Sequence, residues 1–390
     1  MERTPLSPQN VSLHFLGEEA LLFDRESQRL YSANTTAAII WCYLEEGMAP
    51  TQVRELLVER YGLTPEVAAR YVEDLLRQWK TWEAPTETAK THDLRIDRDE
   101  SSEPVEPLEA GGMVRHYQLL DLVVTIRYAA PRLYRWVHRV LRHLTVPVPQ
   151  TKTGPVLTLV ALNDGYALVE DGQPIERCDT QKQVASMVKA HITYRSLKAS
   201  SEFCALHAGA VRRGDRVLLL PGKSASGKST LVAGLIAEGF QLLGDDTTVL
   251  TRDDLSARGV CAGVTVKSGA WSVIAVRYPR LARAPIHDRM DGQIIRYLLP
   301  PEYSIAPQET KLPVGWIVFP RYDAKEATAL HPLSKSAALK RLMPCFVPLR
   351  GRLEPAEIER LVQWVQNIPC YELRVSSLND AVNLMGHLCR

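Results

Sequence analysis

The sequence lacks the features that mark secreted, zinc-binding or membrane proteins. Its seven cysteines are scattered and form no Cys-x-x-Cys pair, which argues against a disulfide framework and against a zinc site. No apolar run approaches the roughly 18 residues of a membrane span, and the polar N-terminus has no signal-peptide pattern. The 47 basic and 45 acidic residues leave no excess of one charge, which argues against a protein that coats nucleic acid. We therefore expect a soluble, cytoplasmic protein.

A chain of 390 residues with 45% hydrophobic content has enough material for several folded domains. We expect a multidomain protein of α/β and α+β class. The predicted divisions are an N-terminal domain, an acidic linker, an α+β subdomain and a catalytic domain, at 1–82, 83–112, 113–201 and 202–390.

The pattern of residues 1–82 predicts three strands followed by three helices, a winged-helix-like order. Turn residues separate the strand candidates 11–15, 20–24 and 29–32. Asn34 is placed to cap the first helix, and Pro50 and Thr64-Pro65 open the other two.

The segment 83–112 has a different composition. It holds nine acidic residues against three basic ones and no aromatic residue. Such a segment repels itself and buries little, so we expect a flexible linker. Beyond it, strand and turn signals in 113–201 predict an α+β subdomain.

The strongest chemical signal is Gly222-Lys-Ser-Ala-Ser-Gly227-Lys228-Ser229, which fits the pattern GxxxxGK[ST]. It follows an apolar strand, 217–220, and opens a helix, the context that a phosphate-binding loop requires. Lys228 is expected to reach the β- and γ-phosphates of a nucleotide, and Ser229 to hold Mg²⁺. The predicted nucleotide-binding residues of this loop are Gly222, Lys223, Ser224, Ala225, Ser226, Gly227, Lys228, Ser229 and Thr230.

A pair of carboxylates, Asp245 and Asp246, follows the next predicted strand. Two acids beside a phosphate loop suit two roles, a Mg²⁺ ligand and a base for an attacking hydroxyl. Chain geometry can bring His207, which precedes the strand leading to the loop, beside them.

These residues together resemble the HPr kinase/phosphorylase family, and most closely its relatives from peptide-modification gene clusters. The matching stretches are 206–210, 221–230, 239–240 and 244–246, with weaker matches as far as 369–373. The resemblance implies phosphoryl transfer from ATP, with Mg²⁺, to a serine or threonine hydroxyl. It gives catalytic roles to Lys228, Asp245, Asp246 and His207, with Asp245 favoured as the base and Asp246, with Ser229, as the metal ligand.

The same resemblance points to two further basic residues. Lys267 is expected near the reacting phosphate or the acceptor, although a solvated lysine at a strand end is an equal alternative. Arg296 is expected to clamp phosphate oxygens. Hexamers occur in the resembled family, so a homo-oligomer is an expectation by analogy.

The residues before the linker are instead similar to the PqqD family, the recognition element for ribosomally made precursor peptides. The match rests on 22–24, 29–31, 34–37, 40–41 and 56–76. The resemblance implies that a leader peptide adds a strand to the third strand. Leu30, Tyr31 and Tyr71 are the candidate peptide-binding residues, with a purely structural role in the small core as the alternative.

The combined hypothesis is an ATP-dependent peptide kinase that captures a precursor through its leader. A downstream modifying enzyme is a further expected partner, and a membrane is not. One alternative is a nucleotide-sensing regulator with a DNA-binding N-terminal domain, which the acidic third helix disfavours. Another is a phosphorylase or ATP hydrolase at the same site.

Overall fold

The computed structural model describes residues 10–17, 19–82, 112–148 and 154–390, which form two compact units. Unit 1 combines the described residues up to 82 with 333–344 and 351–370. Unit 2 combines 112–332, 345–350 and 371–390. The predicted linker lies outside the described residues except for Gly112.

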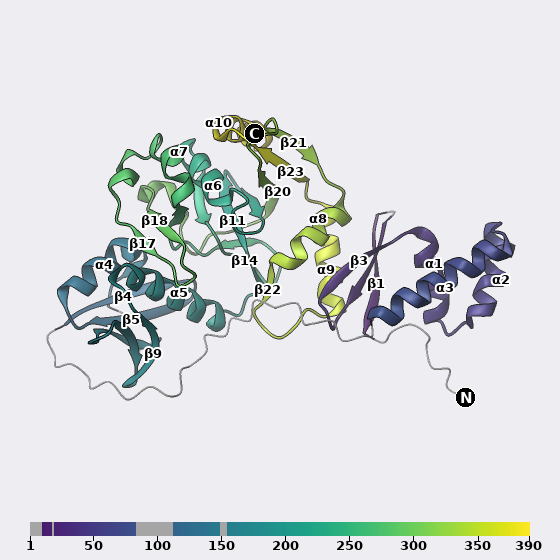
Figure 1. The fold of residues 1–390 in the computed structure, drawn as a ribbon, viewed down its shortest axis with the longest axis horizontal. Coiled ribbons are helices and arrows are strands. Elements are labelled where there is room, and N and C mark those ends of the chain that lie inside the picture. Colours follow the sequence, from purple (N-terminus) through teal and green to yellow (C-terminus); the bar gives the residue numbers. More distant parts are fainter. Residues whose placement is uncertain (1–9, 18, 83–111, 149–153) are drawn as a thin grey trace. The chain divides into compact units, whose positions relative to one another are not determined.

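Unit 1 begins with the predicted order of three strands and three helices (Figure 1). The side chain of Asn34 caps the first helix by accepting a hydrogen bond from Ala37 N at 2.8 Å, as predicted. Gly62 ends the second helix in the left-handed conformation, with φ at 67°. The antiparallel strands are β1 (Val11–Leu16), β2 (Glu19–Asp24) and β3 (Arg29–Ala33), and the helices are α1 (Thr35–Glu45), α2 (Pro50–Tyr61) and α3 (Pro65–Trp82).

The middle strand of this sheet, β2, is buried on both faces. Ala20 and Leu22 join the core formed with α1, α2 and α3. Leu21 and Phe23 alternate with them and are fully buried as well, so the opposite face must also be covered. Within unit 1 that cover comes from two helices late in the chain, α8 (Lys335–Leu342), which contacts β3, and α9 (Pro355–Gln366), which contacts β1.

Polar contacts fix the α9 segment to the first strands. His14 Nδ1 lies 3.0 Å from the Glu359 carboxylate, and Arg25 pairs with Glu354 at 2.7 Å. The Gln28 side chain donates to the Leu353 carbonyl and accepts from its N–H. The predicted catalytic domain at 202–390 is therefore divided in the structure, because α8 and α9 belong to unit 1.

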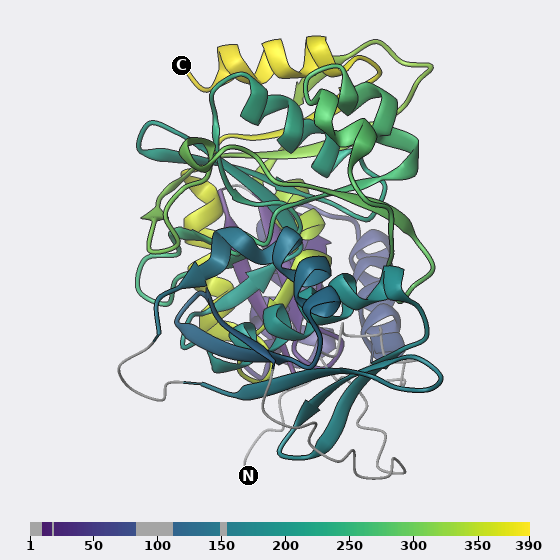
Figure 2. The same ribbon diagram turned by 90° about the vertical axis from the view of Figure 1, so that its left-hand side faces the viewer.

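Unit 2 is organised around β12 (Arg216–Pro221), whose residues 217–221 are all buried. Its six-stranded sheet has the order β13-β11-β12-β20-β23-β21, with β12 and β20 parallel. Helix α6 (Lys228–Ala237) packs on β11, and the C-terminal helix α10 (Leu378–Leu388) packs against α6 (Figure 2). The other strands are β11 (Ala208–Arg213), β13 (Gln241–Gly244), β20 (Val314–Tyr322), β21 (Ala329–Pro332) and β23 (Cys370–Val375).

Two smaller sheets flank it. The first has the order β19-β15-β14-β10-β22, and the second β16-β18-β17. Their elements, with the short helix α7, are β10 (Cys204–Leu206), β14 (Thr248–Leu250), β15 (Ala257–Gly259), β16 (Val264–Lys267), α7 (Trp271–Ala275), β17 (His287–Asp288), β18 (Ile294–Leu298), β19 (Lys311–Leu312) and β22 (Phe346–Pro348).

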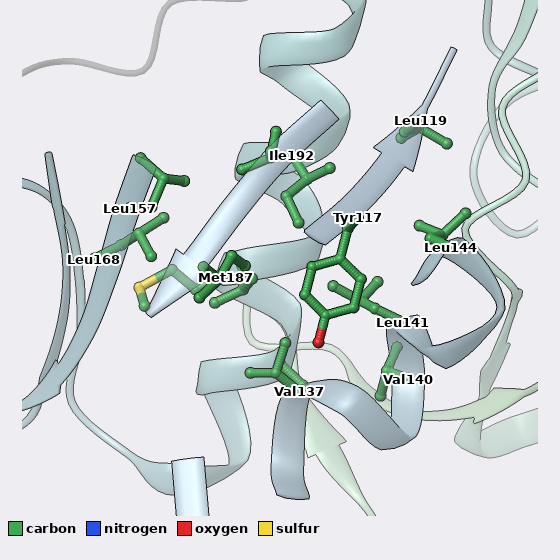
Figure 3. Close-up of a cluster of buried hydrophobic side chains, with 14 of the residues drawn as sticks. Tyr117, Leu119, Val137, Val140, Leu141, Leu144, Leu157, Leu168, Met187 and Ile192 are labelled. Atoms are coloured by element: carbon green, nitrogen blue, oxygen red, sulfur yellow. The ribbon is translucent and has the colours of Figure 1, made fainter. Parts of the chain in front are cut away.

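Residues 113–201 form the predicted α+β subdomain as part of unit 2. A sheet of order β6-β4-β5-β7-β8-β9 packs with two helices around Tyr117, Val137 and Met187 (Figure 3). The Tyr117 hydroxyl lies in this core and bonds to the Tyr128 hydroxyl at 2.8 Å. The elements are β4 (Met113–Leu119), β5 (Leu122–Tyr128), α4 (Pro131–Leu141), β6 (Thr145–Val146), β7 (Val156–Ala161), β8 (Tyr166–Glu170), β9 (Gln173–Cys178) and α5 (Gln181–Ala199).

In the described parts of the chain, no helix combines the length and the apolar character needed to cross a bilayer.

The two-sided burial of β2 makes a stability prediction. Replacing the buried Leu361 of α9 with Ala removes apolar cover and leaves a cavity, at a cost of about 2–5 kcal/mol in the free energy of unfolding. Hydrogen exchange should show faster exchange in residues 19–24 of β2. The exposed Gln366→Ala on the same helix should leave this exchange unchanged. Unchanged protection of β2 in Leu361→Ala would mean that α9 does not support the sheet.

Candidate functional site

The loop after β12 has the backbone that the glycine pattern predicts. Gly222, Ala225 and Gly227 have positive φ values of 158°, 68° and 96°. At Gly222 a side chain would lie only 3.0 Å from Ser226 Oγ, so the tight turn needs glycine there. Helix α6 begins at Lys228 directly after this turn, so its unpaired N–H groups face the loop. Such a loop and helix start form a cradle for anions.

Lys228 lies inside this loop. Its side chain is buried, and its ammonium donates to the carbonyls of Gly222 at 2.5 Å and Lys223 at 2.9 Å. His207 Nε2 lies 3.3 Å from the same ammonium. Burial lowers the pKa of Lys228, while the charges of Asp246 and Asp245 act in the opposite direction. The cation is thus held where an anion in the cradle would meet it.

Asp245 is the buried member of the acid pair. Its Oδ2 accepts a hydrogen bond from Thr265 N at 2.8 Å. Its Oδ1 is buried and has no hydrogen-bond partner. Burial, and then the charge of Asp246, raise the pKa of Asp245 to about 6, while the neighbouring Ser229 side chain lowers it. An orphaned carboxylate oxygen next to a serine hydroxyl fits a Mg²⁺ site, because Mg²⁺ in nucleotide sites takes one or two carboxylates, a hydroxyl and phosphate oxygens.

Asp246 faces a different environment. Its side chain is 48% exposed, and Oδ1 lies 3.5 Å from His207 Nδ1. His207 therefore stands between Lys228 and Asp246, and touches each with a different ring nitrogen. The structure thus brings together four predicted catalytic residues, and it separates the two acids into a buried one and an accessible one.

The two further predicted basic residues differ in position. Lys267 donates to Ser224 Oγ at 2.5 Å, which places its ammonium at the loop. The Arg296 guanidinium lies 4.1 Å from the centre of the Trp271 ring and donates to the Leu281 carbonyl at 3.1 Å. The contacts of Arg296 are therefore at Trp271 and Leu281, not at the loop, and its role as a phosphate clamp stays a prediction.

Lys189, on α5 of the 113–201 subdomain, also lies at the site and was not predicted from the sequence. Its ammonium donates to Thr265 Oγ1 at 3.0 Å, and Thr265 N donates to Asp245. It also lies 4.8 Å from the centre of the Tyr297 ring. Burial lowers the pKa of Lys189, and Asp245 and Asp246 raise it. Only tertiary structure connects Lys189 to the site, so no local pattern could have identified it.

Further contacts join the subdomain to the sheets that carry the site. Arg258 on β15 is buried and makes a two-pronged pair with Asp121 at 2.8 and 2.9 Å. His143 Nε2 bonds to the Cys261 carbonyl at 3.0 Å. The subdomain is therefore a structural part of the site.

A separate candidate site lies in unit 1, between β3 and α3. It is a groove of about 210 Å³ whose lining includes Leu22, Ser32, Ile40, Tyr71 and Leu75. Of the predicted peptide-binding residues, Tyr71 lines this groove and is 40% exposed.

The other two predicted residues lie on opposite faces of β3. Tyr31 pairs with Leu22 on the helix-facing side and packs against the core. Leu30 pairs with Phe23, so it lies on the face away from α3. The structure thus gives Leu30 no place in the groove.

The comparisons with known proteins bear on this first unit. Residues 19–81 match the family model described as Coenzyme PQQ synthesis protein D (PqqD). The match extends from β2 into α3 and contains all of the residues that line the groove. Residues 19–81 are thus a PqqD domain, and PqqD domains bind precursor peptides in the biosynthesis of ribosomally made, modified peptides. A search of curated proteins found no match to the chain.

The hydrogen bond between His143 and the Cys261 carbonyl leads to a prediction about how stability depends on pH. Burial lowers the pKa of His143 from 6.5 to about 4. Since the unfolded chain binds the proton more tightly, stability is present above pH 6.5 and is lost as the pH falls toward 4. At pH 5 the loss should be about 2 kcal/mol in the free energy of unfolding.

Urea unfolding at pH 7.5 and pH 5 measures this loss. His143→Gln keeps a donor for the Cys261 carbonyl and should weaken the acid dependence. His387→Gln, at an exposed position of α10, should keep it. Equal acid dependence in the His143 variant would show that another group is responsible.

Proposed function

We propose that the protein is an ATP-dependent peptide kinase that phosphorylates a serine or threonine of a ribosomally made precursor peptide. The precursor is captured by the PqqD domain of unit 1 and is modified at the loop of unit 2. The observation that carries the proposal is the arrangement around Lys228: an anion cradle, a buried cation and a partnerless carboxylate oxygen within one site.

Bound Mg-ATP would supply the phosphoryl group that is transferred. The backbone of 222–227 and the N-terminus of α6 hold its phosphates. Lys228 balances their charge at the cradle, and Lys267 adds a second cation at the rim. Ser229 and the partnerless Oδ1 of Asp245 would hold the metal ion, which would neutralise phosphate charge there.

The geometry favours a division of labour opposite to the one favoured from sequence. A base must reach a hydroxyl that arrives from solution. Asp246 is half exposed, whereas Asp245 is buried and bonded to Thr265 N. We therefore assign the base to Asp246 and the metal to Asp245.

In the proposed reaction, the terminal phosphoryl group of ATP is transferred to a hydroxyl of the peptide. The oxygen of the peptide hydroxyl forms a bond to the terminal phosphorus, the bond from that phosphorus to the bridging oxygen breaks, and ADP leaves. The hydroxyl proton passes to an oxygen of Asp246. His207 Nδ1, 3.5 Å away, orients that carboxylate. Neutralising charge and holding the reactants in line are the main contributions a protein makes to phosphoryl transfer.

The test is intact-mass spectrometry of candidate precursor peptides taken from the genomic neighbourhood of this gene, each incubated with the protein, Mg²⁺ and ATP. We expect a gain of one phosphoryl group. Lys228→Ala should abolish it, while Lys182→Ala, at an exposed position of α5, should retain most of the activity. Asp246→Asn should lower kcat by a factor of about 100 or more, with ATP binding retained.

Two results would contradict the proposal. Consumption of ATP without a gain in mass would indicate a hydrolase. No ATP binding by the wild-type protein in calorimetry would remove the nucleotide site altogether.

Lys189 provides a separate prediction about positioning. Lys189→Met removes the bond to Thr265 Oγ1, so Thr265 holds Asp245 less firmly. We expect kcat to fall by a factor of about 10, with the KM for peptide unchanged and partial rescue by Lys189→Arg. Lys182→Ala, at an exposed position of the same helix, is the control. Loss of thermal stability with an unchanged kcat would assign Lys189 a purely structural role.

A further inference from the structure

The edge strand of unit 1 presents two faces to any strand that is added to it. Within the described residues β3 pairs only with β2, in the order β1-β2-β3. Tyr31 pairs with Leu22 on the face of α3, and Ser32 pairs with Leu21 on the opposite face. Side chains of an added strand alternate in the same way. Alternate side chains of the added strand would therefore lie in the groove beside α3, and the others would contact the element that covers the opposite face.

Helix α8 lies on that opposite face. It contacts β3, and its buried residues Ala338, Leu339 and Leu342 turn one side of the helix inward. Lys340 extends from α8 to the edge, where its ammonium donates to Ser32 Oγ at 2.6 Å. Ser32 also lines the groove. Lys340 thus reaches the border at which an added strand would lie.

The basic groups on this face of unit 1 differ in whether they have a carboxylate partner. Near β1 and the start of the β2–β3 turn, the basic groups His14 and Arg25 have carboxylate partners on α9 and at its N-cap. Among the hydrogen bonds and ion pairs of the described residues, Lys340 forms only the bond to the neutral Ser32 hydroxyl, and the sequence of α8 contains no acid. The edge at β3 therefore offers an ammonium group to an incoming carboxylate.

The geometry points to α8 as a second wall of the peptide-binding site, with Lys340 selecting an acidic residue of the precursor. We propose that the bound segment lies along β3, with apolar side chains in the groove beside α3 and an Asp or Glu on the opposite face against Lys340. This proposal rests on the proposed function in one respect only, namely that the bound segment belongs to a precursor peptide. It does not depend on phosphoryl transfer.

A displayed library of 12-residue peptides, selected on the full-length protein without ATP, tests the proposal. We expect wild-type selections to enrich Asp or Glu at a position that alternates with apolar residues. Selections on Lys340→Glu should enrich Lys or Arg at that position. Lys182→Glu makes the same change of charge on unit 2 and should keep the wild-type preference.

Calorimetry on one enriched peptide adds a charge-swap test. Lys340→Glu should weaken binding by about tenfold, and exchanging the peptide acid for Lys should restore most of it. Lys340→Met should give an intermediate loss. Matching thermal midpoints would show that the variants are folded.

Three outcomes overturn the proposal: the same position preference on wild type and Lys340→Glu, no rescue by the swapped peptide, and no enriched peptide at all. Failure of the kinase is recognised separately. In that case the charge swap holds, but the precursor gains no mass with ATP.

Discussion

A sheet that is apolar on both faces must be covered on both faces. This constraint determines which parts of the chain belong to unit 1. In unit 1, Leu22 faces α1–α3, while Leu21 and Phe23 are buried on the opposite face. The cover for that face comes from α8 and α9, and the contact between His14 and Glu359 joins residues 345 apart in sequence. The PqqD domain of this protein is therefore not a detachable module on a tether, because removing it would expose the apolar side of α9.

Local signals predicted the parts of the fold that depend on neighbouring residues. Asn34, Gly62 and Pro65 begin or end helices through contacts with neighbouring residues. The elements of 11–82 match the prediction because such local signals determine their ends. The position of α9 could not be predicted in the same way. Its apolar stripe of Ile358, Leu361, Val362 and Val365 requires a partner surface but does not specify which one. Long-range packing alone made that choice.

In the candidate site, too, the sequence could not predict what depends on long-range packing, here the difference between two adjacent residues. The loop pattern and the acid pair were visible in sequence, and the structure brings them together with His207. The roles of Asp245 and Asp246 were not visible, since both are the same residue type in one turn after β13. Burial separates them: Asp245 is 3% exposed, while the Asp246 side chain is 48% exposed. A difference in solvation of this kind gives two carboxylates different chemistry.

The chain passes from unit 1 to unit 2 shortly after α8. Helix α8 ends at Leu342, and three residues later the Cys345 carbonyl accepts the N–H of His207 at 2.8 Å. The next strand, β22, pairs with β10, the strand that leads to His207. Lys340, which bonds to Ser32 in unit 1, is thus only five positions before Cys345, which bonds to His207 in unit 2. Unit 1 therefore cannot be removed as one continuous stretch of chain, because residues 333–344 belong to it while residues 345–350 belong to unit 2.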